Sequence, residues 1–357
     1  MSTLATAQPA RHPDPTVRAR ALAWVAFTRP DLAQAERFLV DFGLRVVTRT
    51  PELLVLRGTG PEAFCYLVQR GTTPRFAGFA LEVGSRADLE RLAALPDAGP
   101  IEALATPGGG ARVRLVDPSG FAVDAVHGRA RATPLPRRPA LPINTPDARP
   151  RVNAGQRPPV APPEVVRLGH VVLELADWQA TCAWYTRHFG LIPSDVQVLP
   201  DGSPAVAFLR LDLGDTPADH HTLALAQGLV PRYSHSAYEV CDTDAVAMGG
   251  RVLRERGWTH AWGVGRHILG SQVFDYWEDA CGDKHEHYGD GDVFTADQPM
   301  GVHAVGRDAM AQWGPPMPAS FVRPPLSAGL LVDVARNLWR SPDLSLGKLV
   351  AMARGLG

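Results

Sequence analysis

The chain has 357 residues, of which 45% are hydrophobic, so it is long enough for more than one folded core. Its 36 basic and 37 acidic side chains are mixed along the sequence and leave a formal net charge of −1, which excludes a strongly basic surface for nucleic acid or an anionic membrane. Four scattered cysteines, no run of membrane-spanning length and no secretory pattern at the N-terminus predict a cytoplasmic protein with reduced thiols.

Regular patterns begin after a polar, proline-containing arm, residues 1–18. Asp31 can cap a first helix and Gly43 can end it. Asp117-Pro118-Ser119-Gly120 can turn a hairpin that closes a first domain, residues 19–128. The predicted strands are 22–28, 53–56, 63–68, 76–83, 111–116 and 121–127, and the predicted helices lie near 31–41 and 87–94.

Residues 129–163 contain ten prolines and seven arginines and almost no apolar periodicity. Such a segment cannot build a sheet or a helix, because proline removes backbone donors and fixes φ. We therefore expect an extended linker that lies over the domains.

The same plan then begins again in residues 164–303. Leu22-Ala23-Trp24-Val25 matches Leu168-Gly169-His170-Val171, and Asp41-Phe42-Gly43-Leu44 matches His188-Phe189-Gly190-Leu191. This repeat predicts an α+β protein with two tandem domains, each made of two βαβββ units. A C-terminal tail, residues 304–357, adds two short helical patterns at 328–340 and 344–354.

Histidine is concentrated in the second half, where ten of the twelve lie between His170 and His303. His170 and His235 each head an apolar run that predicts a strand, in residues 168–175 and 234–240, and a glutamate follows each of them four residues later. Because the two strands are equivalent in the repeat, we expect them to present one imidazole each at the same depth.

A third strand carries His285, Glu286 and His287, and alternation sends Glu286 to the face opposite its two neighbours. If the three strands line one cavity, His170, His235 and Glu286 make a site of two histidines and one carboxylate. Non-haem Fe(II) oxygenases use that ligand set, because it leaves positions free on the ion. We expect His285 and His287 to contact solvent or another subunit.

The first half has different residues at the places that match these ligands. Trp24, Gly78 and Asp124 stand where the second half has a histidine, a histidine and a glutamate. Tryptophan and glycine cannot bind a metal through their side chains. The first half is therefore predicted to be a metal-free copy.

At these residues the chain resembles a type I extradiol ring-cleavage dioxygenase of the vicinal oxygen chelate superfamily. The resemblance is sharpest over residues 168–288, extends to the first half through the repeat and is weak after His303. It implies the vicinal oxygen chelate fold, with Fe(II), or in some members Mn(II), held by His170, His235 and Glu286.

The resemblance also implies roles for other polar residues. His267 matches a histidine that contacts substrate and oxygen, Tyr276 a tyrosine that hydrogen-bonds a catechol oxygen, and His221 the acid/base histidine, although His220 fits the spacing within one residue. The motifs that carry these matches are Asp219-His220-His221-Thr222, Gly265-Arg266-His267-Ile268-Leu269-Gly270 and Phe274-Asp275-Tyr276.

A turn supports one of these roles independently. If Ala280-Cys281-Gly282 is a three-residue hairpin loop with Gly282 left-handed, Tyr276 lies opposite Glu286 across the strand pair. We expect the pocket walls to come from residues 206–211, residues 258–264 and the tail.

The implied reaction is Fe(II)-dependent extradiol (meta) cleavage of a substituted catechol-type ring with O2, through a lactone, to a hydroxymuconic semialdehyde-type product. Such an enzyme would serve aromatic catabolism, with a catecholic substrate and O2 as partners, and we expect a homo-oligomer. Two alternatives stay open. One is a glyoxalase-like lyase or isomerase of the same superfamily, which usually has a fourth protein ligand, and the other is a non-catalytic aromatic-binding protein.

Overall fold

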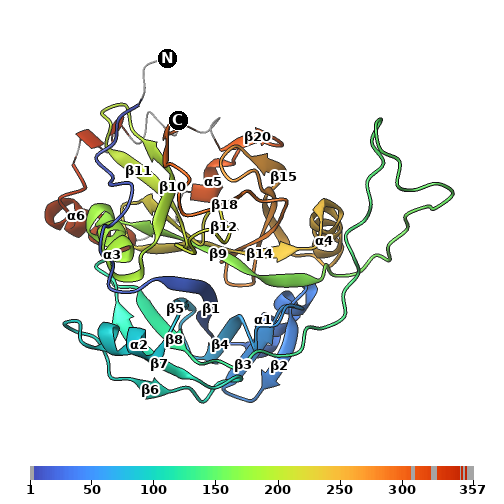
Figure 1. The fold of residues 1–357 in the computed structure, drawn as a ribbon, viewed down its shortest axis with the longest axis horizontal. Coiled ribbons are helices and arrows are strands. Elements are labelled where there is room, and N and C mark those ends of the chain that lie inside the picture. The colour runs from blue at the N-terminus through green and yellow to red at the C-terminus, as the bar shows by residue number, and fades with distance from the viewer. Residues whose placement is uncertain (1–3, 307–309, 323–327, 346, 349, 352–357) are drawn as a thin grey trace.

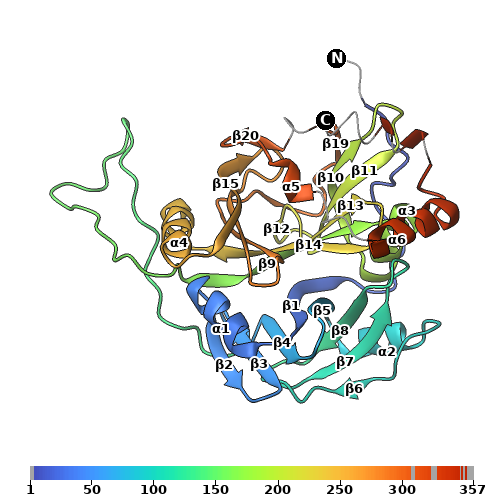
Figure 2. The same cartoon turned by 180° about the vertical axis from the view of Figure 1, so that it is seen from behind.

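Two large β-sheets lie one against the other in the computed structural model, with the first half of the chain below and the second half above in Figure 1, and Figure 2 shows the same arrangement from behind. The structure describes residues 4–306, 310–322, 328–345, 347–348 and 350–351.

The first sheet has eight strands in the order β2-β3-β4-β1-β5-β8-β7-β6. Its elements are β1 (Ala19–Arg29), α1 (Leu32–Asp41), β2 (Arg45–Arg49), β3 (Leu53–Arg57), β4 (Tyr66–Arg70), β5 (Arg75–Val83), α2 (Arg86–Ala93), β6 (Glu102–Ala103), β7 (Ala111–Val116) and β8 (Ala122–His127).

The second sheet has ten strands in the order β19-β10-β11-β13-β9-β14-β17-β16-β15-β20, and β12 pairs separately with β18. The elements are β9 (Val165–Leu175), α3 (Trp178–Phe189), β10 (Ile192–Val198), β11 (Pro204–Arg210), β12 (Ala218–Asp219), β13 (Leu223–Gln227), β14 (Arg232–Val240), α4 (Thr243–Glu255), β15 (Thr259–His267), β16 (Val273–Glu278), β17 (Lys284–Gly289), β18 (Val293–Phe294), β19 (Gly301–Ala304), β20 (Ala311–Trp313), α5 (Ala319–Val322) and α6 (Ala328–Arg340).

The two sheets repeat one topology, with β19 and β20 added at the edges of the second. Their registers also agree at the positions that the sequence repeat aligned. The paired residues are Trp24–Ala80–Asp124 in the first sheet and His170–Ala237–Glu286 in the second. The predicted α+β fold of paired βαβββ units is confirmed.

Local signals explain where several elements begin and end. Asp31 accepts a hydrogen bond from the backbone of Gln34 at 2.9 Å and so caps α1, as predicted, and Gly43 follows the helix with a φ of +110°. The prediction of a strand over residues 63–68 is wrong at its start, because β4 begins only at Tyr66, and β2 and β6 were missed. β2 is an edge strand with no buried residue, so its sequence carries no alternation.

The interface between the sheets corrects the expectation for two histidines. His285 and His287 are fully buried against the first half, where His285 Nε2 lies 2.9 Å from the Tyr66 hydroxyl and His287 Nε2 lies 2.7 Å from the Phe42 carbonyl oxygen. Burial lowers the pKa of both imidazoles to about 4, so both are neutral at pH 7. They contact neither solvent nor a second subunit, because the first half supplies their partners.

Residues 129–163 contain no helix or strand. The beginning of this segment lies over the first sheet, where the Leu135 amide donates to the Thr59 carbonyl at 2.8 Å, and the Arg138 guanidinium pairs with both oxygens of Asp242. The middle then projects from the body as a long arm (Figure 1), tied across itself by Asn144 and Arg151. Only part of the segment therefore lies over the domains.

The C-terminal tail contacts several strands of the second sheet. β20 pairs with β15, and Phe321 of α5 packs on Tyr276 with a centroid distance of 4.9 Å. α6 has its predicted bounds, whereas the second predicted tail helix, 344–354, lies partly outside the described residues. Within the described part of the chain, no helix is long and apolar enough to span a membrane.

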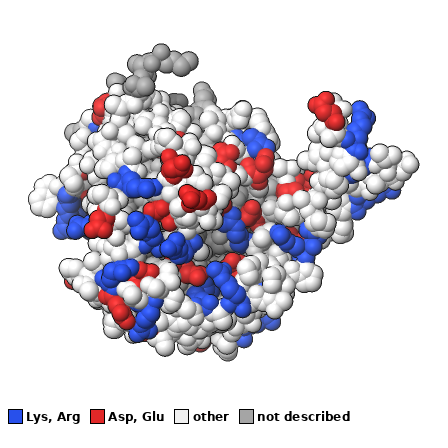
Figure 3. Space-filling view, viewed as in Figure 1, with Lys and Arg blue, Asp and Glu red and all other residues white. Residues whose placement is uncertain are grey.

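Charged side chains of both signs are interspersed on the face seen in Figure 3, in keeping with the balanced composition.

Candidate metal centre

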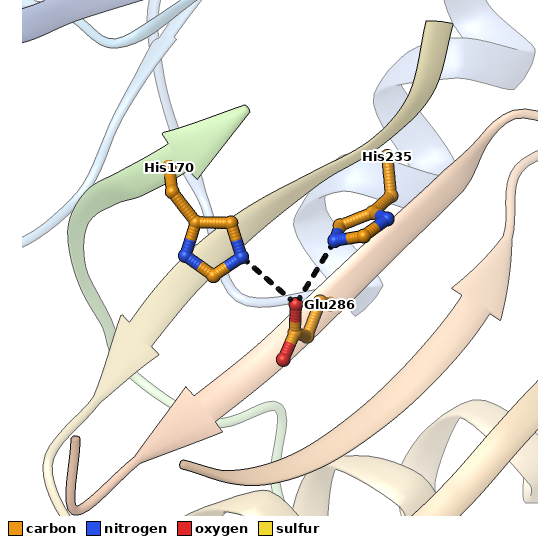
Figure 4. Close-up of side chains that lie close together, drawn as sticks. All are labelled: His170, His235 and Glu286. Carbon is orange, nitrogen blue, oxygen red and sulfur yellow. Dashed lines mark hydrogen bonds and ion pairs between the residues drawn. The ribbon is translucent and has the colours of Figure 1, made fainter. Parts of the chain in front are cut away.

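Three neighbouring strands of the second sheet bring the candidate ligands together. His170 lies on β9, His235 on β14 and Glu286 on β17, and their side chains point toward one another in Figure 4. Glu286 Oε2 is 3.2 Å from His170 Nε2 and 3.4 Å from His235 Nε2. One ligand atom from each residue lies within 4.8 Å of the others, and all three residues are buried.

The electrostatics of this group suit a divalent cation. Burial alone would raise the pKa of Glu286, but the neighbouring His170 and His235 imidazoles hold it well below its usual value, so the side chain is a carboxylate. Burial lowers the pKa of His235 to about 4, although Glu286 opposes the shift, so this imidazole is neutral and keeps a lone pair. Oε1 of Glu286 is buried without a hydrogen-bond partner. A buried anion beside two imidazole rings therefore fits a bound metal ion.

A hairpin places Tyr276 beside this group. Gly282 has a φ of +82°, the Asp279 and Asp283 backbones pair across the loop, and Tyr276 lies opposite Glu286, as the three-residue loop predicted. Burial, reinforced by the negative charge of Glu286, raises the pKa of Tyr276 well above its usual value, so its hydroxyl stays protonated.

His267 connects the tyrosine to the tail. Its Nε2 lies 2.8 Å from the Tyr276 hydroxyl and 3.7 Å from Glu286 Oε1. Its Nδ1 lies 2.9 Å from the Met310 carbonyl oxygen, which can only accept, so in the neutral ring Nδ1 carries the proton and Nε2 accepts from Tyr276.

The structure separates the two adjacent histidines that the sequence left open. The His221 ring lies 4.0 Å from the His170 ring, centroid to centroid, whereas His220 turns toward Asp195. Burial, followed by the nearby His170 and His220, lowers the pKa of His221 well below its usual value. His221 is thus the neutral imidazole beside the candidate ligands.

Aromatic side chains form a wall beside Tyr276. Trp262 stacks on Tyr276 at 5.5 Å, Phe321 approaches the His235 ring at 6.3 Å, and Phe208 lies 5.1 Å from His221. The three come from the segments expected to form pocket walls. The sequence did not single out Phe321, which stands in a proline-rich tail with no periodic pattern.

The matching place in the first sheet is filled. Trp24 packs on Phe64 at 5.0 Å beneath the Arg129 guanidinium, and Asp124 pairs with Arg112 at 3.3 Å. Among the described residues, the triad of the second sheet is the one group of three or more side chains that could hold a metal.

Known proteins resemble this chain over most of its length. It is 33% identical to metapyrocatechase 2 of Cupriavidus necator over 303 residues, which cover 82% of this chain and 88% of that protein. The chain matches no protein-family model.

Solved structures share the fold. The Mn(II)-bound glyoxalase of Novosphingobium aromaticivorans matches with a TM-score of 0.72 and 23% identity, covering 87% of this chain and 96% of that chain. Homoprotocatechuate 2,3-dioxygenase of Arthrobacter globiformis matches with a TM-score of 0.71 and 21% identity, covering 91% and 95%. An extradiol ring-cleaving dioxygenase of B. fuscum matches with a TM-score of 0.72 and 19% identity, covering 88% of this chain and 84% of that chain.

Proposed function

This chain belongs to the extradiol ring-cleaving dioxygenases of the vicinal oxygen chelate superfamily, and we propose that its second half cleaves a catechol at an Fe(II) ion held by His170, His235 and Glu286. The observation that carries the ligand assignment is the convergence of these three buried side chains on one point, with a buried carboxylate oxygen left without a partner. When bound, a divalent ion lowers the pKa of a coordinated hydroxyl and holds the diol close to O2.

His221 is the proposed proton carrier. Its depressed pKa leaves it neutral at pH 7, and its ring lies against His170, beside the place where the diol would bind. A neutral imidazole can take the proton of a catechol hydroxyl and return it later in the reaction.

Tyr276 and His267 are the proposed partners of the catechol on the opposite side of the site. Tyr276 keeps its proton and lies opposite Glu286, so its hydroxyl can hydrogen-bond a catechol oxygen. His267 holds that hydroxyl at 2.8 Å and is itself anchored to the Met310 carbonyl, so it orients the tyrosine and contacts substrate and oxygen.

The wall beside the site supports a substrate with apolar substituents. Trp262 and Phe321 both pack on Tyr276, and Met317 belongs to the same buried cluster. We propose a substituted catechol whose substituent lies against this cluster. The proposed product is a hydroxymuconic semialdehyde-type acid, formed in the breakdown of aromatic compounds.

A metal and substrate panel tests this function. Protein stripped by a chelator is loaded anaerobically with Fe(II), Mn(II), Zn(II) or Ni(II), and then receives either catechols in air or the hemithioacetal of glutathione and methylglyoxal. We expect a yellow ring-fission product with Fe(II), a smaller rate with Mn(II) and no hemithioacetal turnover. Isomerisation of the hemithioacetal with Zn(II) or Ni(II), without ring cleavage, would instead support the glyoxalase-like alternative.

The same panel tests whether the enzyme prefers an uncharged or a carboxylated catechol. Methyl-substituted catechols are expected to give a higher kcat/KM than 3,4-dihydroxyphenylacetate, because the described wall around Tyr276 is aromatic. A clear preference for the carboxylated ring would contradict the proposed substrate class while leaving the ring cleavage in place.

We further propose that the enzyme acts in the cytoplasm as a homo-oligomer. A reducing compartment keeps iron ferrous and cysteines as thiols. The projecting arm exposes Ile143 and Val152 by 64% and 75%, and we propose that it contacts another copy. Light scattering during size-exclusion chromatography tests the oligomer.

A further inference from the structure

A chain of hydrogen bonds leads from His221 through His220 to Asp195 and His303. His221 Nδ1 lies 3.0 Å from His220 Nδ1, and His220 Nε2 lies 2.6 Å from Asp195 Oδ2. The other oxygen of Asp195 lies 2.7 Å from His303 Nε2. The chain thus joins β10, the segment before β13, and β19, and it ends at His303, which is part-exposed.

The surroundings hold this chain in one arrangement. The His220 ring lies between Phe208 and Phe294, at 5.5 and 5.6 Å. Gly270 has a φ of +84°, and a Cβ there would come within 3.0 Å of His220 Nδ1. A Cβ on Gly301 would collide with the Asp195 carboxylate. Glycine at both positions leaves the room that the cluster occupies.

The direction of each hydrogen bond follows from the carboxylate. Burial would raise the pKa of Asp195, but hydrogen bonds from His220 and His303 bring it below its usual value, so Asp195 is ionised and only accepts. His220 must therefore carry its proton on Nε2. In the neutral ring its Nδ1 is then a lone pair, which can only accept.

His221 is the next residue in this chain of hydrogen bonds. The group facing His220 Nδ1 is His221 Nδ1, which must donate and therefore carries the proton of the neutral His221 ring. Nε2 of His221 is left unprotonated, and among the described residues it has no hydrogen-bond partner.

We propose that Asp195, acting through His220, fixes the His221 tautomer in which Nε2 is the free proton acceptor. Asp195 and His220 are positioning residues for the reaction rather than groups that touch the substrate. The role of His221 Nε2 as acceptor of a catechol proton rests on the proposed ring cleavage. The tautomer of His221 does not depend on that function.

Two variants of His220 separate hydrogen bonding from packing. His220→Gln can donate its amide N–H to Asp195 and offer its oxygen to His221, so it preserves the direction of both bonds. His220→Phe keeps a flat ring between Phe208 and Phe294 but makes neither bond. Asp195→Leu removes the carboxylate, and His303→Gln is the outer control, because it leaves the bond between Asp195 and His220 in place.

The direct test is nitrogen NMR of the metal-free protein labelled with 15N-histidine, since ring nitrogen shifts distinguish the two neutral tautomers. We expect His221 protonated on Nδ1 in the wild type, His220→Gln and His303→Gln, and a shift toward Nε2 protonation in His220→Phe and Asp195→Leu. A His221 protonated on Nε2 in the wild type, or an unchanged tautomer in His220→Phe, would overturn the proposal. So would a changed tautomer in His303→Gln.

Kinetics of the Fe(II)-loaded variants give the second readout. kcat on catechol should fall roughly 10–100-fold in His220→Phe, with KM changed less than threefold, and return most of the way in His220→Gln. Melting temperature and iron content show that each variant is folded and loaded.

If the tautomers behave as expected but even the wild type cleaves no catechol, the proposed function fails and the positioning of His221 stands. If the wild type cleaves catechol but His220→Phe does so equally well, the positioning fails alone.

Discussion

Trp24 occupies in the first sheet the position that His170 occupies in the second. Each lies on the first strand of its half, and each is paired through an alanine on the neighbouring strand with a carboxylate one strand further. The indole of Trp24 is buried against Phe64, so this place is packed rather than open. One fold thus carries a filled copy of this three-strand arrangement and a copy that holds the candidate metal ligands.

The number of metal ions bound per chain follows from the correspondence between Trp24 and His170. We expect one ion per chain, and Glu286→Gln should weaken its binding more than ~100-fold, because it removes the buried negative charge that balances the cation. Asp124→Asn, at the matching place in the first sheet, is the control and should leave the stoichiometry at one. Metal titration with elemental analysis measures both, and two ions per wild-type chain would contradict the assignment.

Tyr276→Phe should separate catalysis from metal binding. The variant keeps the ring that packs on Trp262 but loses the hydroxyl beside Glu286, so iron should be retained while kcat falls roughly 10²-fold. Steady-state oxygen uptake with catechol and iron analysis of the same sample make the measurement. Loss of iron together with activity would show that the hydroxyl supports the ligands instead.

Acid should destabilise the interface between the sheets. The pKa of His287 is about 4 in the folded chain and about 6.5 when unfolded, so between these values the unfolded chain binds the extra proton and stability falls as the pH falls. The contribution is fully present above pH ~6.5. A single such group changes the free energy of unfolding by up to ~1.4 kcal/mol per pH unit.

His287→Phe isolates this term, because phenylalanine can still stack on Phe42, which lies 3.7 Å from the His287 ring, and cannot titrate. Urea unfolding of metal-free protein between pH 7.5 and 5 should show a smaller loss of stability in the variant. Equal slopes for variant and wild type would mean that the pKa of His287 is the same in the folded and the unfolded chain.

The projecting arm should be cleavable without separating the two halves. Trypsin is expected to cut after Arg151, since proline follows both Arg149 and Arg157. The fragments should stay together in size-exclusion chromatography, because Arg29 pairs with Asp279 across the buried interface and His285 and His287 hydrogen-bond the first half. Dissociation after the cut would show that the linker holds the halves together.

Much of the fold was predictable because its signals are local or occur twice. Asp31 and the Asp117-Pro118-Ser119-Gly120 turn act within a few residues, and the repeat aligned Trp24 with His170 before any register was known. The edge strands β2, β19 and β20 were not predicted, because short exposed strands have no buried face to impose alternation.

The part of the candidate site that was predictable is the part set by the alternation of side chains along a strand. Alternation placed Glu286 on the face opposite His285 and His287. It does not predict that the first half of the chain covers those two histidines. Asp195 and His303 lie 108 residues apart and meet only because β10 and β19 pair in parallel. No local pattern encodes such a contact.

The most direct test of ring cleavage at His170, His235 and Glu286 is oxygen stoichiometry after anaerobic loading with Fe(II). Catechol is added, and O2 consumption is followed in an electrode cell while the absorbance of the yellow product is recorded. We expect one O2 consumed per ring opened, no hydrogen peroxide, and neither signal in Glu286→Gln. Oxygen consumption without ring opening, or ring opening that persists in Glu286→Gln, would contradict it.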